Sequence, residues 1–120
     1  RRGGAADVSI VRQVQNKRKH PSMQVQLNVG GVLYMTTTST LTGTTCYFQA
    51  LVGHNPNRLD FFVDRDPTHF RHVLNWLRGV KWIPEDLATL SELEWEADFF
   101  CIPELVDAIR VKRRAALRAM

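Results

Sequence analysis

The sequence is poor in the features that mark several common protein classes. Its 120 residues include only two cysteines, Cys46 and Cys101, so neither a disulfide scaffold nor a four-cysteine zinc site can form. No apolar run approaches the roughly 18 residues that span a bilayer, and the N-terminus lacks the hydrophobic stretch of a secretory signal. We therefore expect a soluble protein without membrane contact that works in the cytoplasm, with the nucleus as the alternative.

The sequence also lacks a constellation of catalytic residues. Its histidines do not have the spacing of a zinc protease, and no serine lies in a nucleophile elbow. His69 and His72 would need a third ligand to hold a metal, and such pairs are more often surface residues beside an apolar stripe. Gly30-Gly31 precedes another strand pattern, unlike a phosphate-binding loop. We expect no enzyme, no cofactor or metal, and no small-molecule substrate.

An ordinary composition is combined with an uneven distribution of charge. The chain is 44% hydrophobic and 23% charged, which fits one globular domain. Residues 1–23 carry six bases and one acid, residues 110–120 carry five bases and no acid, and residues 24–109 carry five bases and eleven acids. We expect a disordered basic leader over 1–23, a domain over 24–110, and a basic helix end or linker over 111–120.

The two basic ends allow two interpretations. Clustered Lys and Arg release counterions when they bind a polyphosphate, which would make these ends a nucleic-acid contact. We favour solvated ends, because no aromatic stacking residues lie between the bases and because bases suit a helix C-terminus. Lys17-Arg18-Lys19 is also a candidate for a weak localisation signal.

A β-hairpin is predicted at the start of the domain. Residues 24–29 alternate polar and apolar side chains, and residues 32–37 are rich in β-forming types. Gly30-Gly31 between them suits a two-residue turn, because both turn positions need positive φ. A third strand is expected over residues 59–63, with the all-apolar centre Phe61-Phe62-Val63.

The stretch over residues 36–45 holds seven threonines and one serine. It could be a phosphorylation segment, but hydroxyl side chains also cap turns. We favour the end of the second strand running into a helical turn that Ser39 or Thr40 starts. A short buried helix is then expected over residues 46–52, before a loop over 53–57.

The segment Asp64-Arg65-Asp66-Pro67 joins the third strand to a helix. Asp66 suits the N-cap and Pro67 the first helical position, and Gly79 is expected to end the helix. Between them the apolar residues fall on one helical stripe, namely Phe70, Val73, Leu74 and Leu77. Asp64 and Asp66 could be read as paired catalytic carboxylates, but capping and pairing with Arg65 are sufficient explanations.

Two more helices complete the predicted domain. One is expected over residues 90–101, with Ser91 and Glu94 as a capping box. Trp95 and Phe99 should lie opposite its core face, which consists of Leu90, Leu93, Ala97 and Phe100. A last helix starts at Pro103, with inward residues Ile102, Leu105, Val106 and Ile109.

Several of these motifs follow one another at spacings typical of a known family. They are the segment Val25-Gln26-Leu27-Asn28-Val29-Gly30-Gly31 with the threonines after it, Phe61 to Pro67 with His69-Phe70, Leu74-Asn75-Trp76-Leu77-Arg78-Gly79, and Leu93 to Leu105. Over residues 24 to about 110 the chain resembles a BTB/POZ domain of the potassium-channel-tetramerisation type, closer to the KCTD proteins than to the channels. The resemblance implies the BTB/POZ fold of the α/β (α+β) class, a small three-stranded sheet with a hairpin packed against a cluster of helices.

The resemblance also implies a homo-oligomer, a closed ring of four or five copies with a polar interface. A ring needs a heterologous interface, in which each subunit offers two different patches. Our first assignments to that interface are Asp64, Arg65 and Asp66, and the next are Asn28, Thr37, Asn75 and Arg78.

The intersubunit zinc site of many channel domains is not expected in this chain. Anchored on Pro84, its ligand positions fall at residues that cannot bind zinc, namely Trp82, Ala88, Ile109 and Arg110. Cys46 and Cys101 are then expected to be small buried apolar residues.

Many KCTD proteins recruit substrates to a cullin ubiquitin ligase, and the resemblance extends that expectation to this chain. Aromatic anchors dominate interface energetics, so the candidates for partner binding are Trp82, Ile83, Trp95 and Phe99. Two alternatives stay open: the cytoplasmic tetramerisation domain of a voltage-gated potassium channel, and a nucleic-acid binder that uses the basic ends. Five copies per ring would exclude the channel, and DNA binding that falls steeply with salt would indicate the nucleic-acid binder.

Overall fold

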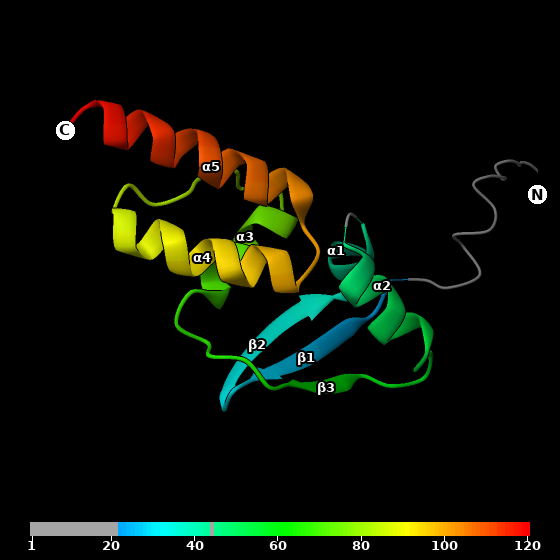
Figure 1. Cartoon of the computed structure of the whole chain (residues 1–120). Helices are drawn as coiled ribbons and strands as arrows, with labels where there is room; N and C mark the ends of the chain where they lie inside the picture. The colour runs from blue at the N-terminus through cyan, green and yellow to red at the C-terminus, as the bar shows by residue number, and fades with distance from the viewer. Residues whose placement is uncertain (1–21, 44) are drawn as a thin grey trace, which may run out of the picture.

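The computed structural model describes residues 22–43 and 45–120. The predicted basic leader therefore lies outside the described residues, except for Ser22 and Met23. Figure 1 shows a small sheet at the bottom of the molecule, two long helices side by side above it, and two short helices at one end of the sheet. The architecture is the mixed sheet-and-helix class that the sequence predicts.

Three strands form the sheet in the order β2-β1-β3. β1 (Gln24–Val29) is antiparallel to β2 (Val32–Thr37) and parallel to β3 (Asp60–Val63). Gly30 and Gly31 have φ of 55° and 104°, so the predicted Gly-Gly hairpin turn is confirmed. β2 is thus an edge strand of the sheet, and β3 is the other edge.

The sheet buries one face and leaves the other open. Alternate residues of β1 and β3 point into the core, namely Val25, Leu27, Val29, Phe61 and Val63. The predicted third strand is present, and its central residue Phe62 is 60% exposed while Phe61 and Val63 are buried. Because β3 also alternates, the open face carries large apolar side chains.

Two short helices follow the hairpin, α1 (Thr38–Thr42) and α2 (Cys46–Gly53). Thr37 caps α1, since its hydroxyl accepts a hydrogen bond from the backbone N–H of Thr40. The predicted caps at Ser39 or Thr40 are therefore too late in the sequence. In α2 only Phe48 is fully buried, so this helix is covered on one side only.

α3 (Phe70–Leu77) begins three residues after the predicted start. Asp66 does not cap this helix, because its carboxylate accepts from the backbone N–H (2.9 Å) and the hydroxyl (2.5 Å) of Thr68 in the turn before it. The end of the helix is as predicted. Gly79 has φ of 96°, and the next N–H donates back to the carbonyl of Asn75.

The two long helices are α4 (Leu87–Phe99) and α5 (Pro103–Arg118). α4 begins three residues before the predicted start because Asp86, and not Ser91, is its N-cap. α5 continues through the basic C-terminal residues up to Arg118. No helix in the described part of the chain is long and apolar enough to cross a membrane.

The core lies between the sheet and the helices. Its centre is a cluster of three fully buried rings from α2, α3 and the end of α4. Phe48 stacks on Phe100 with 5.3 Å between ring centroids, and Phe70 meets Phe100 edge-on at the same distance. This packing fixes the start of α3 and the end of α4 against the sheet, close to the polar side chains described below.

Candidate functional site

The loop between β3 and α3 is tied to the rest of the protomer by Arg65. Its Nε and Nη2 donate to the two carboxylate oxygens of Glu96 at 3.2 and 2.8 Å. The guanidinium also lies over the ring of Phe99, 4.2 Å from its centroid. Glu96 is largely buried and Arg65 is half-buried, so this ion pair gives Arg65 a structural role within one copy.

The two acids beside Arg65 remain at the surface. The pKa of Asp66 is lowered, first by the hydroxyl and then by the backbone N–H of Thr68, both of which donate to the carboxylate. Asp64 is exposed, and its carboxylate has no hydrogen-bond or ion-pair partner among the described residues. The loop thus presents negative charge to solvent at one end of the sheet.

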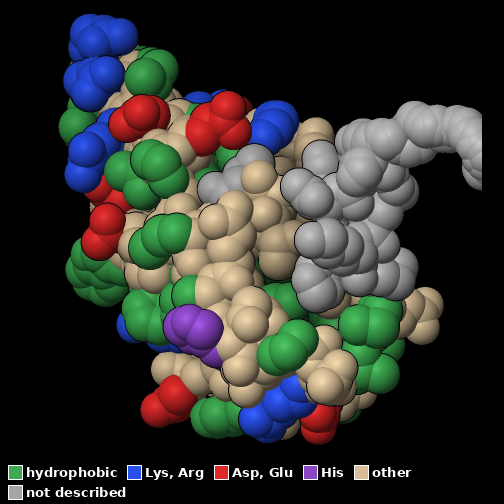
Figure 2. Space-filling view, turned by 90° about the vertical axis from the view of Figure 1, so that its right-hand side faces the viewer, with side chains coloured by type: hydrophobic (Ala, Val, Ile, Leu, Met, Phe, Trp, Pro, Cys, Tyr) green, Lys and Arg blue, Asp and Glu red, His purple; other side chains and the backbone are tan. Residues whose placement is uncertain are grey.

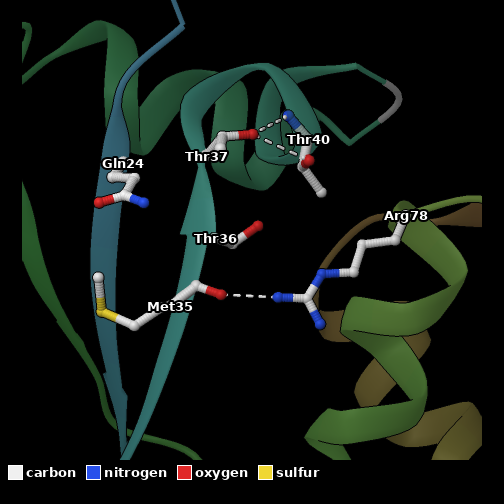
Figure 3. Close-up of a pocket in the computed structure, with 6 residues that line it drawn as sticks. All are labelled: Gln24, Met35, Thr36, Thr37, Thr40 and Arg78. Carbon is white, nitrogen blue, oxygen red and sulfur yellow. Dashed lines mark hydrogen bonds between the residues drawn. The ribbon is translucent and has the colours of Figure 1, made fainter.

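A pocket of about 270 Å³ lies at the outer edge of β2 (Figure 3). Its lining comes from β1, β2, α1 and the end of α3, namely Gln24, Met35, Thr36, Thr37, Thr40 and Arg78. Arg78 reaches across from α3, and its Nη2 donates to the carbonyl of Met35 at 2.6 Å. The positive charge of Arg78 is thereby held at the mouth of the pocket.

Thr36 contributes an unusual group to this pocket. The residue is 7% exposed, and its hydroxyl is buried with no hydrogen-bond partner among the described residues. In Figure 3 the hydroxyl lies between Arg78 and the pair of Thr37 and Thr40. A buried hydroxyl without a partner is costly, and a guanidinium with one bond made has further donors. The pocket is therefore suited to an incoming oxygen acceptor such as a carboxylate.

The structure separates the seven residues assigned to an interface into two groups. Arg78 and Thr37 meet in the pocket, whereas Asp64, Arg65 and Asp66 lie in the loop next to the hairpin turn. Asn28 accepts from the N–H of Gly31 within that turn, and Asn75 is half-buried in α3. The sequence analysis missed Thr36 and Thr40. The threonine run was the available signal for these two residues. It did not predict the pocket, because Arg78 approaches them from a helix far away in the sequence.

The four candidates for partner binding have different surroundings. Ile83 is 8% exposed and belongs to the core, so it presents little surface. Trp82 and Trp95 are 56% and 68% exposed, and Trp82 packs beside the ring of His72. Phe99 lies partly under Arg65.

Burial lowers the pKa of His72, with smaller contributions from Arg71 and His69.

Three of the five basic side chains at the end of α5 pair with two acids of the same protomer. Glu94 accepts from Arg110 at 2.8 Å and from Arg113 at 2.6 Å, and Lys112 pairs with Glu85 at 3.0 Å. Figure 2 shows Lys and Arg side chains at the top of the molecule with acidic side chains close beside them. This arrangement gives little support to the nucleic-acid alternative at this end.

The histidines and cysteines are placed as follows. His69 binds Glu92 with 2.6 Å between Nε2 and Oε1, and its ring stacks on that of His72. Within residues 22–43 and 45–120, no three His, Cys, Asp or Glu side chains gather as a metal site would require. The expectation that both cysteines are buried is wrong, because Cys46 is exposed at the start of α2 and Cys101 is half-buried.

Comparison with known proteins decides the family. The family model described as BTB/POZ domain matches residues 25–109, which is most of the chain. The chain belongs to the BTB/POZ domain family. The predicted fold is thereby confirmed, and the KCTD relatives described next confirm the resemblance to that type.

Curated relatives of this BTB/POZ domain are similar over about three quarters of the chain. The human BTB/POZ domain-containing protein KCTD21 is 37% identical over 95 residues, which cover 73% of this chain and 36% of the relative. Human KCTD5 is 38% identical over 102 residues, covering 78% and 43%. The FH protein interacting protein FIP2 of Arabidopsis thaliana is 36% identical over 102 residues, covering 78% and 34%. The chain thus spans well under half the length of these relatives.

Proposed function

We propose that this domain assembles with copies of itself into a closed ring and carries out no reaction. The contact joins the Arg78 pocket of one copy to the acidic loop, Asp64 to Asp66, of the next. Membership of the BTB/POZ family is consistent with an oligomerisation and protein-interaction module. The ring and its contact surfaces are supported by three features of the protomer.

The first support is where the two charged patches lie. A ring requires two different, complementary patches on different sides of the subunit. The pocket lies where β2 runs into α1, at one end of the sheet. The acidic loop lies at the opposite end, packed against Gly30 of the hairpin turn (Figure 1). One patch is positive and the other negative, so copies placed side by side bring opposite charges together.

The second support is the pocket's unfilled hydrogen-bonding capacity, and this observation carries the proposal. The buried hydroxyl of Thr36 has no partner among the described residues, and Arg78 uses Nη2 on Met35. A carboxylate entering the pocket would accept from both. Asp64 is better placed than Asp66 to supply that carboxylate, because one oxygen of Asp66 already accepts hydrogen bonds from Thr68.

The third support is the open face of the sheet between the two patches. Leu33 of β2, Asn28 of β1 and Phe62 of β3 stand in one row across the three strands. Leu33 and Phe62 are 57% and 60% exposed, and Met35 in the next row is also exposed. Large apolar side chains grouped on one face are typical of a surface that another protein covers.

Charge exchange tests the ring and the contact separately. The native mass of the wild type should be four or five times that of the protomer. Arg78→Glu and Asp64→Arg should each give monomers, and the two changes in one chain should restore the ring. A 1:1 mixture of the two single variants should restore a ring only if the number of copies is even, because the variants must alternate. Arg71→Glu and Asp107→Arg, exposed charges on α3 and α5, are matched controls.

The outcomes distinguish two kinds of failure. A wild type that remains monomeric at tens of micromolar would refute the ring itself. Rings that persist in both single variants would place the contact elsewhere on the domain while leaving oligomerisation intact.

A finer proposal concerns a partner of the assembled ring. We propose that the ring binds a cullin, with Trp95 as the anchor, as expected for a KCTD-type adaptor that recruits substrates to a ubiquitin ligase. Trp95 supports this because it is the more exposed of the two surface tryptophans and lies on α4 away from the core. Trp95→Ala should weaken binding to a purified cullin N-terminal fragment by about 30-fold, as for a typical interface hot spot, with Trp82→Ala as the matched variant. No binding by the wild-type ring would refute this partner.

A further inference from the structure

The two cysteines of the chain lie together in the fold, although they are far apart in the sequence. Cys46 is the first residue of α2, and Cys101 lies in the turn between α4 and α5. The Cys46 side chain is close enough to raise the pKa of the Cys101 thiol, and Cys101 Sγ donates to the carbonyl oxygen of Phe99 at 3.9 Å. Cys46 is exposed and Cys101 is half-buried, so the pair can be reached from solvent.

Contacts on both sides of the pair hold the two segments in register. Before Cys46, the hydroxyl of Thr45 donates to the backbone carbonyl of Phe100 in the buried interior. After it, the ring of Tyr47 lies 5.1 Å from that of Phe99 and 5.2 Å from that of Phe100, centroid to centroid. The residues next to the two cysteines are therefore in direct contact, which places Cys46 and Cys101 on neighbouring segments of the folded chain.

The backbone at Cys101 is unusual for a residue with a side chain. Its φ is 59°, and Cys101 is the one residue other than glycine with positive φ in the described part of the chain. Here α4 ends with the N–H of Ile102 donating to the carbonyl of Ala97 at 2.9 Å, an arrangement that usually has glycine at this position. The fold thus holds a thiol at a fixed position where glycine would be less strained.

We propose that Cys46 and Cys101 form a reversible intramolecular disulfide when the protein meets a peroxide such as hydrogen peroxide. The bond would fasten the start of α2 to the turn between α4 and α5. This modification site is independent of the proposed ring contact, because none of its residues lies in the Arg78 pocket or the acidic loop.

The chemistry takes place in two balanced steps. The Cys46 thiolate attacks one peroxide oxygen, an S–O bond forms, the O–O bond breaks, and the leaving hydroxide becomes water with the proton lost by Cys46. The sulfur of Cys101 then attacks the sulfenic acid of Cys46, the S–S bond forms, and the S–O bond breaks. The departing hydroxide takes the proton from Cys101 as water. In total two thiols lose two electrons and two protons, and one peroxide becomes two waters.

The surroundings assign these roles to the two sulfurs. The neighbouring Cys46 side chain, followed by burial, raises the pKa of the Cys101 thiol, which keeps it protonated and a poor first nucleophile. Cys46 is the more exposed of the two residues, so the oxidant reaches it first. Cys101 then acts as the resolving thiol.

Oxidation of the full chain by a small excess of hydrogen peroxide tests the proposal. Intact mass should fall by two hydrogen atoms, the count of free thiols should fall from two to zero, and a peptide map should link the two cysteines. Closing so long a segment should raise the melting temperature by roughly 10 °C, and dithiothreitol should reverse the rise.

Two variants serve as controls. Cys46→Ser should keep its remaining thiol and show no thermal shift. Cys101→Gly, which suits the positive φ and should fold at least as well as the wild type, should accumulate an unresolved sulfenic acid at Cys46. Oxidation of methionine alone, or disulfides only between chains, would overturn the proposal.

Discussion

Two arginines of this domain look equivalent in the sequence and have opposite surroundings in the fold. Arg65 is half-buried, donates to both oxygens of Glu96 and lies over the ring of Phe99. Arg78 is exposed and spends one donor on the carbonyl of Met35, beside the unpartnered hydroxyl of Thr36. A guanidinium group whose N–H donors are bonded within the protomer stabilises the fold. A guanidinium group with unused N–H donors is available to bind a second molecule. Of the two predicted interface residues, Arg78 is therefore better supported than Arg65.

The largest effect is expected where the backbone of the Arg65 loop touches the hairpin turn. A Cβ at Gly30 would lie 2.3 Å from the carbonyl oxygen of Arg65 and 3.1 Å from Cδ of Pro67. Gly30→Ala should therefore lower the free energy of unfolding by about 3 kcal/mol, from strain at positive φ together with the clash. Urea denaturation would measure this loss.

Gly31→Ala is the matched control for this prediction. Gly31 also has positive φ, but a Cβ there would meet nothing within 4 Å. The loss should be about 1–2 kcal/mol, from backbone strain alone. If the two variants lose equal free energy of unfolding, the Arg65 loop can move away from the added Cβ, and its contact with the turn does not constrain residue 30.

A smaller effect is expected from removing each arginine in turn. Arg65→Ala leaves Glu96 largely buried without its partner and should cost about 2 kcal/mol, below the value for a fully buried pair because Arg65 is partly exposed. Arg78→Ala should cost no more than about 0.5 kcal/mol in the same measurement. Both should be compared in the Asp64→Arg background, so that loss of assembly does not contribute to the unfolding free energy.

A double replacement separates charge from packing at Arg65. Arg65→Met with Glu96→Leu removes both charges and should recover most of the lost stability, because no buried charge is left unpaired. If Arg78→Ala proves as destabilising as Arg65→Ala, the contrast between the two sites is wrong.

What the sequence could predict depends on how far each interaction reaches along the chain. The hairpin and the core faces of α4 and α5 were predicted correctly, because alternation, a Gly-Gly turn and helical spacing are local signals. Helix starts were missed where two local caps compete. Asp86 caps α4 ahead of Ser91, and one carboxylate oxygen of Asp66 accepts both bonds from Thr68 before α3 begins.

The distinction between Arg65 and Arg78 could not be read from the sequence. Glu96 lies 31 residues after Arg65, and Met35 lies 43 residues before Arg78. No sequence motif links residues at either spacing, so only the packing of α3 and α4 decides which guanidinium group finds its partners within the protomer. The closeness of Cys46 to Cys101 is hidden for the same reason, and the expectation that both cysteines are buried is wrong.

The smallest effect concerns Asp66, the acid of the loop that is partly engaged within its own protomer. Thr68 lowers the pKa of Asp66 in the folded state, so the stability from this contact is complete above the unfolded pKa of about 4 and is lost as pH falls through the lower folded value. Thr68→Val should move the pKa of Asp66 upward in an NMR titration and reduce the acid-induced loss of stability. Thr89→Val should do the same for Asp86, which accepts the same two bonds from Thr89. An unchanged titration of Asp66 would mean that its carboxylate is as open as that of Asp64, and the two acids would then be equal candidates for the pocket of the next copy.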